Sequence, residues 1–317
     1  MSKSISAERP VARHVLTGML DLPPSRATQA RSLRIQANLP SMVSQAERAM
    51  SFGAVAGDYD RARPGPPDDA VDWLLPADCQ TAVDLGAGTG LLSRALVGKV
   101  AQVVAVEPDA RMRAVLAARS PGVRVVDGTG EAIPLPDASA DGVFVSSAWH
   151  WMDPDRAVPE IGRVLRDGGR FGVLWTSRAR ESSWLRELGL ARAAAIADPD
   201  ADAATQGRPR HHDVWLPEAG LFDNIETESF GFTRVMTIDS IVEMLATYSR
   251  IITASPQDRS AELARARTAL LERFPDAAEI DVPMRARCWR ANRADRADRA
   301  DRADRADRAD GATSVLP

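Results

Sequence analysis

The chain has 317 residues and a formal net charge of −4, and 44% of its residues are hydrophobic and 26% charged. This size predicts one globular domain with attached segments, and the slightly acidic charge argues against nucleic acid or an anionic membrane as a partner. Two cysteines are too few for a disulfide framework, no residue pattern suggests a metal site, and no run reaches the roughly 20 apolar residues of a membrane span. We therefore expect a cytoplasmic protein without a metal, either a monomer or a homodimer.

Three segments of the chain differ in composition. Residues 1–48 lack a clear hydrophobic period and are rich in Ser, Arg, Ala and Pro, so we expect a poorly ordered extension. Residues 49–292 carry the pattern of a folded domain, in which residues 178–222 are expected to form an insertion on the substrate side. In residues 293–317 the triplet Arg-Ala-Asp repeats. A period of three gives a helix no apolar face, so we expect a solvated or disordered tail.

A strand, a tight turn and a helix start follow one another at residues 82–97. The apolar run Ala82–Leu85 stops at Gly86, Gly88 and Gly90, and a helical pattern over Thr89–Val97 begins at once. Because glycine has no Cβ atom, a ligand can approach the backbone closely at such a turn. The stretch predicts a cofactor-binding turn. A turn that serves only to join strand and helix is the alternative.

An acidic residue ends the next predicted strand. The apolar run Val103–Val106 is followed by Glu107 and Pro108, and a helix is expected over Asp109–Arg119. In nucleotide-binding α/β sheets, an acid at the end of the second strand accepts hydrogen bonds from the ribose hydroxyls. Glu107 is therefore the candidate ribose ligand, with Pro108 beside it. The alternative is a solvated strand end.

Strands and helices continue to alternate through the domain. This alternation predicts parallel strands with helices on both faces, and ligands bind at the carboxyl ends of such strands. Gly128 and Ser147 fall at two further strand ends. We expect strands over Val123–Val126, Ala140–Ser146, Arg170–Thr176, Ile225–Thr237 and Val282–Trp289, and helices over Asp68–Leu75, Asp155–Leu165, Glu181–Ala197, Ile238–Ile252 and Asp258–Phe274.

The glycine spacing separates two cofactor classes. The dinucleotide fingerprint G-x-G-x-x-G would place its third glycine at Leu91, whereas this chain has Gly90. The pattern Asp84-x-Gly86-x-Gly88-x-Gly90 resembles the first motif of the class I S-adenosylmethionine-dependent methyltransferases. The resemblance implies a doubly wound α/β fold with a mostly parallel seven-stranded sheet and an antiparallel last strand, and S-adenosylmethionine as the cofactor.

Further segments are similar to the type 11 small-molecule methyltransferase subgroup, which includes trans-aconitate methyltransferase. The stretch from Gly128 to Pro136 resembles its G-x-A-E-x-L-P segment, although Thr129 stands where many members have Asp, and Gly130 stands in place of Ala. The stretch Ala148–Asp153 resembles A-x-H-W-x-D, and Phe52–Pro67 resembles the lead-in that covers the cofactor in relatives.

The resemblance implies a role for each candidate residue. The three glycines admit the methionine part of the cofactor, and Asp84 organises that turn or meets the amino group through water. Arg63 clamps a carboxylate of cofactor or substrate, and His150 and Tyr59 are the candidates for catalysis, with packing as the alternative role for His150. The adenine is expected against the loop Gly128, Thr129, Gly130 and Glu131, and the other cofactor contacts at Glu107, Pro108 and Ser147.

Three functions are compared on this basis. The favoured one is methyl transfer to a small-molecule acceptor, at a carboxylate or hydroxyl oxygen. The second is an NAD-dependent oxidoreductase on a related sheet, which the glycine spacing disfavours. The third is a cofactor-binding interaction protein without catalysis.

Overall fold

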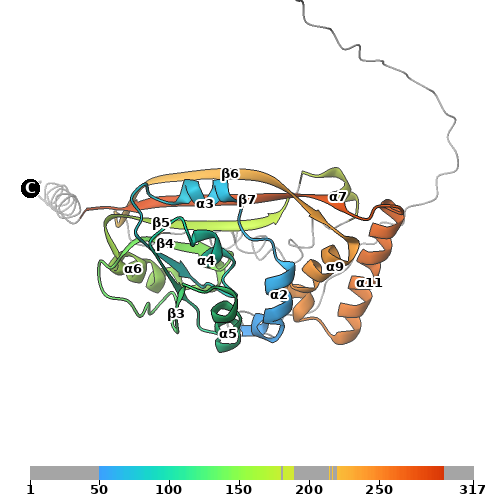
Figure 1. Ribbon diagram of the computed structural model, residues 1–317, viewed down its shortest axis with the longest axis horizontal. Coiled ribbons are helices and arrows are strands. Elements are labelled where there is room, and N and C mark those ends of the chain that lie inside the picture. Colours follow the sequence, from blue (N-terminus) through green and yellow to red (C-terminus); the bar gives the residue numbers. More distant parts are fainter. Residues whose placement is uncertain (1–49, 180, 189–213, 215, 217–219, 296–317) are drawn as a thin grey trace, which may run out of the picture. The chain divides into compact units, whose positions relative to one another are not determined.

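The computed structural model describes residues 50–179, 181–188, 214, 216 and 220–295. Its centre is a seven-stranded sheet with the strand order β3-β2-β1-β4-β5-β7-β6 (Figure 1). Strands β1 to β5 pair parallel with one another, whereas β7 pairs antiparallel with both β5 and β6. The predicted α/β fold with an antiparallel last strand is therefore confirmed. The strands are β1 Thr81–Leu85, β2 Gln102–Val106, β3 Arg124–Val126, β4 Ala140–Ser146, β5 Leu165–Arg178, β6 Phe222–Met236 and β7 Ile280–Arg293.

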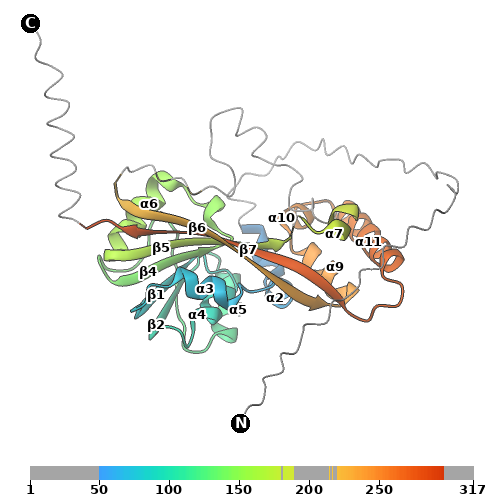
Figure 2. The same cartoon turned by 90° about the horizontal axis from the view of Figure 1, so that it is seen from above.

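Helices cover both faces of the sheet (Figure 2). Helices α3 and α4 pack on one face around Phe144 and Leu174, and α6 packs on the other face around Val143 and Phe171. The central strands β1 and β2 are buried along almost their whole length, which is why they read as continuous apolar runs. The helices are η1 Phe52–Val55, α2 Ala56–Ala62, α3 Asp68–Leu74, α4 Leu91–Leu96, α5 Ala110–Arg119, η2 Trp149–Trp151, α6 Pro154–Val164, α7 Ser183–Glu187, α9 Ile238–Ala246, α10 Ser249–Ile252 and α11 Pro256–Arg273.

Strands β6 and β7 extend past the rest of the sheet and carry a second apolar core. In Figure 1 they run on toward α9 and α11, and α2 lies beside α9. This core joins Ile241 and Met244 of α9 to Leu270 of α11 and to Val282 and Met284 of β7. The lead-in segment at the start of the domain therefore packs against helices from the end of the chain.

The structure divides the helix that was expected over Ile238–Ile252. Helix α9 ends at Ala246, and α10 begins at Ser249. The Thr247 hydroxyl donates a hydrogen bond to the Met244 carbonyl at 2.7 Å, and Arg63 Nη2 donates to the Thr247 carbonyl at 3.1 Å. These bonds occupy the groups that would continue the helix, and they leave Tyr248 at the break.

Other predicted boundaries also differ from the structure, and the difference at β5 has a visible cause. Strand β5 begins at Leu165 rather than Arg170, because Leu165 already pairs with Ala140 and the register then shifts before Gly142. Residues 166–169, which include Gly168 and Gly169, thus form an irregularity within the strand pairing. Of the helix expected over Glu181–Ala197, the structure describes α7, and the remainder lies outside the described residues, as do residues 1–48 and most of the repeat tail.

Two strand glycines make room for the ring of Phe144, and one of them gives a stability test. A Cβ atom on Gly172 would lie 2.8 Å from both Phe144 and Leu74. We expect Gly172→Ala to lower the free energy of unfolding by about 1–3 kcal/mol, because overpacking displaces a buried ring. Denaturant unfolding measures this loss in the free energy of unfolding. Gly231→Ala in β6 is the control, since its Cβ would meet nothing within 4 Å, and an equal loss there would contradict the packing argument.

Candidate active site

The glycine turn lies at the carboxyl end of β1 and is tied to β2. The amides of Gly86 and Ala87 donate hydrogen bonds to the Val106 carbonyl at 2.9 and 3.1 Å. Gly86, Gly88 and Gly90 have positive φ values of 69°, 56° and 89°, which side chains with a Cβ atom rarely adopt. The backbone of the turn is thus bare, and it borders the ends of two parallel strands.

The three glycines meet different surroundings. A Cβ atom on Gly86 would lie 2.8 Å from Ala148 Cβ, and one on Gly90 would lie 2.8 Å from Leu116 Cγ. A Cβ atom on Gly88 would meet nothing within 4 Å. Packing against neighbouring side chains therefore explains why positions 86 and 90 must lack a Cβ atom, whereas Gly88 borders open space that a ligand can enter.

Glu107 lies beside this open position. One carboxylate oxygen accepts a hydrogen bond from the Gly88 amide at 2.8 Å, and the other accepts one from the Asp109 amide at 2.9 Å. The side chain is buried, and burial raises its pKa although the two amides act in the opposite direction. Each oxygen still has a second lone pair, so the carboxylate can accept two further hydrogen bonds from a ribose. Asp109 itself caps α5.

Asp84 is buried completely under the turn. Its Oδ2 accepts a hydrogen bond from the Ser93 hydroxyl of α4 at 2.6 Å. Within the described residues, Asp84 Oδ1 and the Thr89 hydroxyl beside it have no hydrogen-bond partner. Burial raises the pKa of Asp84 to about 7. Asp84 therefore links the turn to the following helix, and one of its oxygens remains available.

The loop after β3 supports the segment after β4. A Cβ atom on Gly130 would lie 2.6 Å from Met152 Sδ, and Glu131 accepts a hydrogen bond from the Asp153 amide at 2.8 Å. Glu131 thus has a positioning contact in addition to its predicted cofactor role. Thr129 and Pro108 are exposed, so both can contact a ligand that lies across the sheet edge.

A row of aromatic rings runs from the end of β4 to the lead-in segment. Ser147 turns the chain with a positive φ of 55°. The His150 ring lies 4.4 Å from the Trp151 ring, Trp151 lies 6.0 Å from Phe52, and Phe52 lies 5.8 Å from Tyr59, all between ring centroids. The structure therefore brings the two candidates for catalysis, His150 and Tyr59, into one row of side chains.

The lead-in segment contacts the glycine turn. Arg94 donates one hydrogen bond to the Thr89 carbonyl at 2.9 Å and forms an ion pair with Asp60 at 2.6 Å. Arg111 in α5 also donates to the Met50 carbonyl at 2.7 Å. These bonds hold residues 50–60 across the part of the sheet edge where the cofactor is expected.

Arg63 lies at the other end of this segment, against the helices that follow β6. Its Nε donates to the Thr247 hydroxyl at 2.8 Å, and its guanidinium carbon lies 5.1 Å from the Tyr59 ring and 4.0 Å from the Tyr248 ring. Arg178, the last residue of β5, lies 5.0 Å from the same Tyr248 ring. The sequence analysis did not identify Arg178 or Tyr248. The signal for Arg178 was weak: an arginine that stands three residues after the apolar run Val173–Trp175, near the carboxyl end of a predicted parallel strand.

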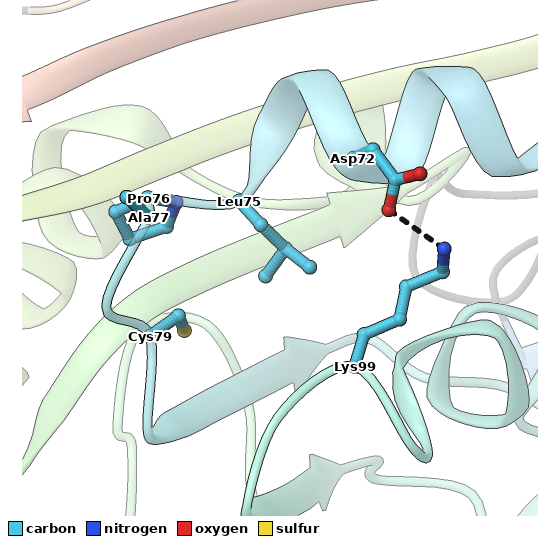
Figure 3. Close-up of a pocket in the computed structure, with 6 residues that line it drawn as sticks. All are labelled: Asp72, Leu75, Pro76, Ala77, Cys79 and Lys99. Atoms are coloured by element: carbon cyan, nitrogen blue, oxygen red, sulfur yellow. Dashed lines mark hydrogen bonds and ion pairs between the residues drawn. The ribbon is translucent and has the colours of Figure 1, made fainter.

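A small cavity lies at the opposite edge of the sheet. It has a volume of about 320 Å³ and is lined by Asp72, Leu75, Pro76, Ala77, Cys79 and Lys99 (Figure 3). Lys99 is bound to Asp72 at 2.6 Å, and burial raises the pKa of the Cys79 thiol to about 12. Cys79 is therefore not a nucleophile at neutral pH, and this cavity is not a candidate site.

Among the described residues, no group of three or more His, Cys, Asp and Glu side chains is placed to hold a metal ion. None of the helices in the described ranges combines the length and the apolar character needed to cross a bilayer.

The residues at the carboxyl edge fit S-adenosylmethionine. Glu107 offers free lone pairs at the end of β2, and Gly88 leaves its face open beside them. Asp84 Oδ1, for which the described part of the chain offers no hydrogen-bond partner, belongs to the strand that leads into the same turn. An acid at this strand end suits a ribose, and bare backbone suits the amino-acid end of the cofactor.

Known proteins agree with this geometry. The methyltransferase-domain family matches residues 83–173. An uncharacterized methyltransferase of Mycobacterium tuberculosis strain H37Rv is 41% identical over 227 residues, covering 72% of this chain and 88% of the relative. A malonyl-[acyl-carrier protein] O-methyltransferase of Methylococcus capsulatus is 42% identical over 133 residues, covering 38% of this chain and 48% of the relative. A solved methyltransferase structure from Anaeromyxobacter dehalogenans is 25% identical with a TM-score of 0.55, covering 73% of this chain and 97% of the other.

These likenesses favour the methyltransferase interpretation over an NAD-dependent oxidoreductase. The family match over residues 83–173 includes the glycine turn and most of the parallel strands. The protein belongs to the class I S-adenosylmethionine-dependent methyltransferases.

Proposed function

We propose that this enzyme transfers a methyl group to an oxygen atom of a small-molecule acceptor at the carboxyl edge of the sheet. One observation carries the proposal. The lead-in segment is bound to the glycine turn through Asp60 and Arg94 and to the C-terminal helices through Arg63 and Thr247. Tyr59 therefore lies between the cofactor half of the site and a second half that is lined by positive charge.

Each predicted residue is assigned to one part of the cofactor. Glu107 holds the ribose, and the turn with Gly88 receives the methionine part. The loop with Gly128, Thr129, Gly130 and Glu131 borders the adenine, together with Pro108, and Ser147 lies at the strand end that faces the methyl group. When bound, S-adenosylmethionine supplies a methyl group on a sulfonium, whose carbon–sulfur bond breaks as the acceptor oxygen bonds to the carbon.

The chain's own contribution is to hold the acceptor in line and to exclude water. Such positioning is worth roughly 7–11 kcal/mol of the barrier in well-oriented reactions. A carboxylate acceptor has no proton to lose. A hydroxyl acceptor gives its proton to a base, and His150 and Tyr59 are the groups in the aromatic row that can accept or relay it.

An oxygen acceptor is supported by one relative. The Methylococcus capsulatus protein is named a malonyl-[acyl-carrier protein] O-methyltransferase, and that name specifies methyl transfer to oxygen. A small acceptor with a carboxylate is consistent with the arginines beside Tyr248. A cytoplasmic location, a monomer or homodimer, and the segment boundaries at residues 48 and 293 stay predictions.

Methyl transfer from labelled S-adenosylmethionine into a metabolite extract tests the proposal. We expect label in small molecules and not in protein or nucleic acid.

We also expect Glu107→Gln to weaken S-adenosylmethionine binding about tenfold in calorimetry, since a hydrogen bond to a charged group is worth about 1.5 kcal/mol or more.

Asp127→Asn is the matched control for Glu107→Gln. Asp127 follows the neighbouring strand β3 and forms an exposed ion pair with Arg113 at 2.9 Å. Its removal should leave binding unchanged. If Glu107→Gln and the parent bind S-adenosylmethionine with equal affinity, Glu107 does not hold the ribose. Label confined to macromolecules would contradict a small-molecule acceptor.

A further inference from the structure

We infer that Arg178 is the residue that selects an anionic acceptor, by binding a carboxylate of the substrate beside the Tyr248 ring. The inference rests on the proposed function and adds the substrate class and the residue that recognises it.

Arg178 is a buried cation that has no counterion in the part of the chain that the structure describes. Its side chain is 4% exposed, and both terminal nitrogens lack a hydrogen-bond partner within the described residues. Leaving a buried charge unpaired is costly, so such groups are normally paired with an opposite charge. The parallel fork of two guanidinium N–H groups matches the two oxygens of a carboxylate. The missing partner of Arg178 is therefore an anion, and a carboxylate fits its geometry.

Other cations surround this position. The guanidinium carbon of Arg63 lies 4.0 Å from the centroid of the Tyr248 ring, and that of Arg178 lies 5.0 Å from the same centroid. Burial lowers the pKa of Arg178, Tyr248 acts in the opposite direction, and Arg63 and Arg250 lower it further. Of the three arginines, Arg250 pairs with Glu262 at 3.1 Å, and Arg63 bonds to uncharged groups of Thr247. One carboxylate paired with three guanidiniums leaves an excess of positive charge.

The cluster lies at the correct edge of the sheet for an acceptor. Arg178 is the last residue of β5, and β5 is parallel to β4, whose end leads into η2 with His150 and Trp151. Arg63 also contacts Tyr59 at 5.1 Å, and Tyr59 belongs to the aromatic row. A substrate whose carboxylate binds Arg178 can thus extend along Tyr248 and Tyr59 toward the methyl group.

Small dicarboxylates test the inference by calorimetry on the full chain, with malonate, succinate and glutarate as probes and succinamide as the uncharged counterpart. We expect at least one dicarboxylate to bind and succinamide not to bind. Arg178→Met should weaken that binding at least tenfold, and Arg178→Lys should give an intermediate loss because it keeps the charge without the fork. Arg178→Met should also melt at a higher temperature than the parent, since it removes an unpaired buried charge.

Arg186→Gln is the charge-matched control, because Arg186 is exposed on α7 and its loss changes the net charge equally. It should bind the dicarboxylate like the parent. Unchanged dicarboxylate binding by Arg178→Met, or binding of succinamide as tight as that of succinate, would overturn the inference. Binding of S-adenosylmethionine without binding of any dicarboxylate would overturn this inference alone. A chain that does not bind S-adenosylmethionine would overturn the proposed function.

Discussion

An Asp84→Asn variant should be more stable than the parent above pH 7, by an amount on the order of 4 kcal/mol. Burial raises the pKa of Asp84 to about 7, whereas an aspartate in an unfolded chain has a pKa of about 4. Between these pH values the folded state keeps a proton that the unfolded state has lost. The free energy of unfolding of the parent therefore falls as pH rises from about 4 to about 7. Each pKa unit corresponds to about 1.4 kcal/mol.

Urea unfolding of both proteins at a series of pH values measures this difference. Well below pH 4 the carboxyl is protonated in both states, so the parent and Asp84→Asn should be similar in stability there. Asp109→Asn is a control with the opposite sign. The hydrogen bond from Arg111 holds the pKa of Asp109 below its usual value, so its stabilising effect is present above pH 4 and is lost as pH falls. A pH-independent difference between Asp84→Asn and the parent would show that Asp84 is not a buried acid.

A Gly88→Ala variant should lose S-adenosylmethionine binding about 100-fold and still fold. Its Cβ would meet no protein atom within 4 Å, so the folded chain has space for the methyl group. That space lies beside the Glu107 carboxylate, where the cofactor is expected, and a clash there costs about 1–3 kcal/mol. The left-handed backbone adds about 1–2 kcal/mol to the cost of folding.

Gly98→Ala separates the two effects. Gly98 also has a positive φ, of 83°, and its Cβ would meet nothing within 4 Å, but it follows α4 at the opposite edge of the sheet from the glycine turn. Gly98→Ala should lose about as much folding stability as Gly88→Ala and should bind S-adenosylmethionine as tightly as the parent. Calorimetry with S-adenosylmethionine and denaturant unfolding give both quantities for each variant. Normal S-adenosylmethionine binding by Gly88→Ala would show that the cofactor does not lie against this turn.

Much of the cofactor half of the site could be predicted from short stretches of sequence. The glycines at positions 86, 88 and 90 need left-handed backbone, and that requirement is local. The position of Glu107 follows from counting one strand further along the chain, because parallel strands end at one edge. Strand β4 was predicted with the bounds that the structure shows, since its apolar run begins and ends at polar residues.

The acceptor half could not be predicted in this way. The helical period over Ile238–Ile252 is unbroken in the sequence, and the break at Thr247 depends on Arg63, which is 184 residues away. Arg178 reads as a surface residue after a strand, and only the tertiary structure, in which it is buried and lies against the distant Tyr248, makes it a buried cation. The pKa of Asp84 likewise depends on the strands that flank it on both sides.

The sequence by itself determined the α/β fold, the glycine turn and the acid that faces the ribose. These follow from hydrophobic periodicity and backbone conformation, which act between near neighbours in the chain. Only the tertiary structure decided which charges are buried and which aromatic rings meet. Burial and unpaired charge arise from contacts between segments that are distant in sequence, and no local pattern records them.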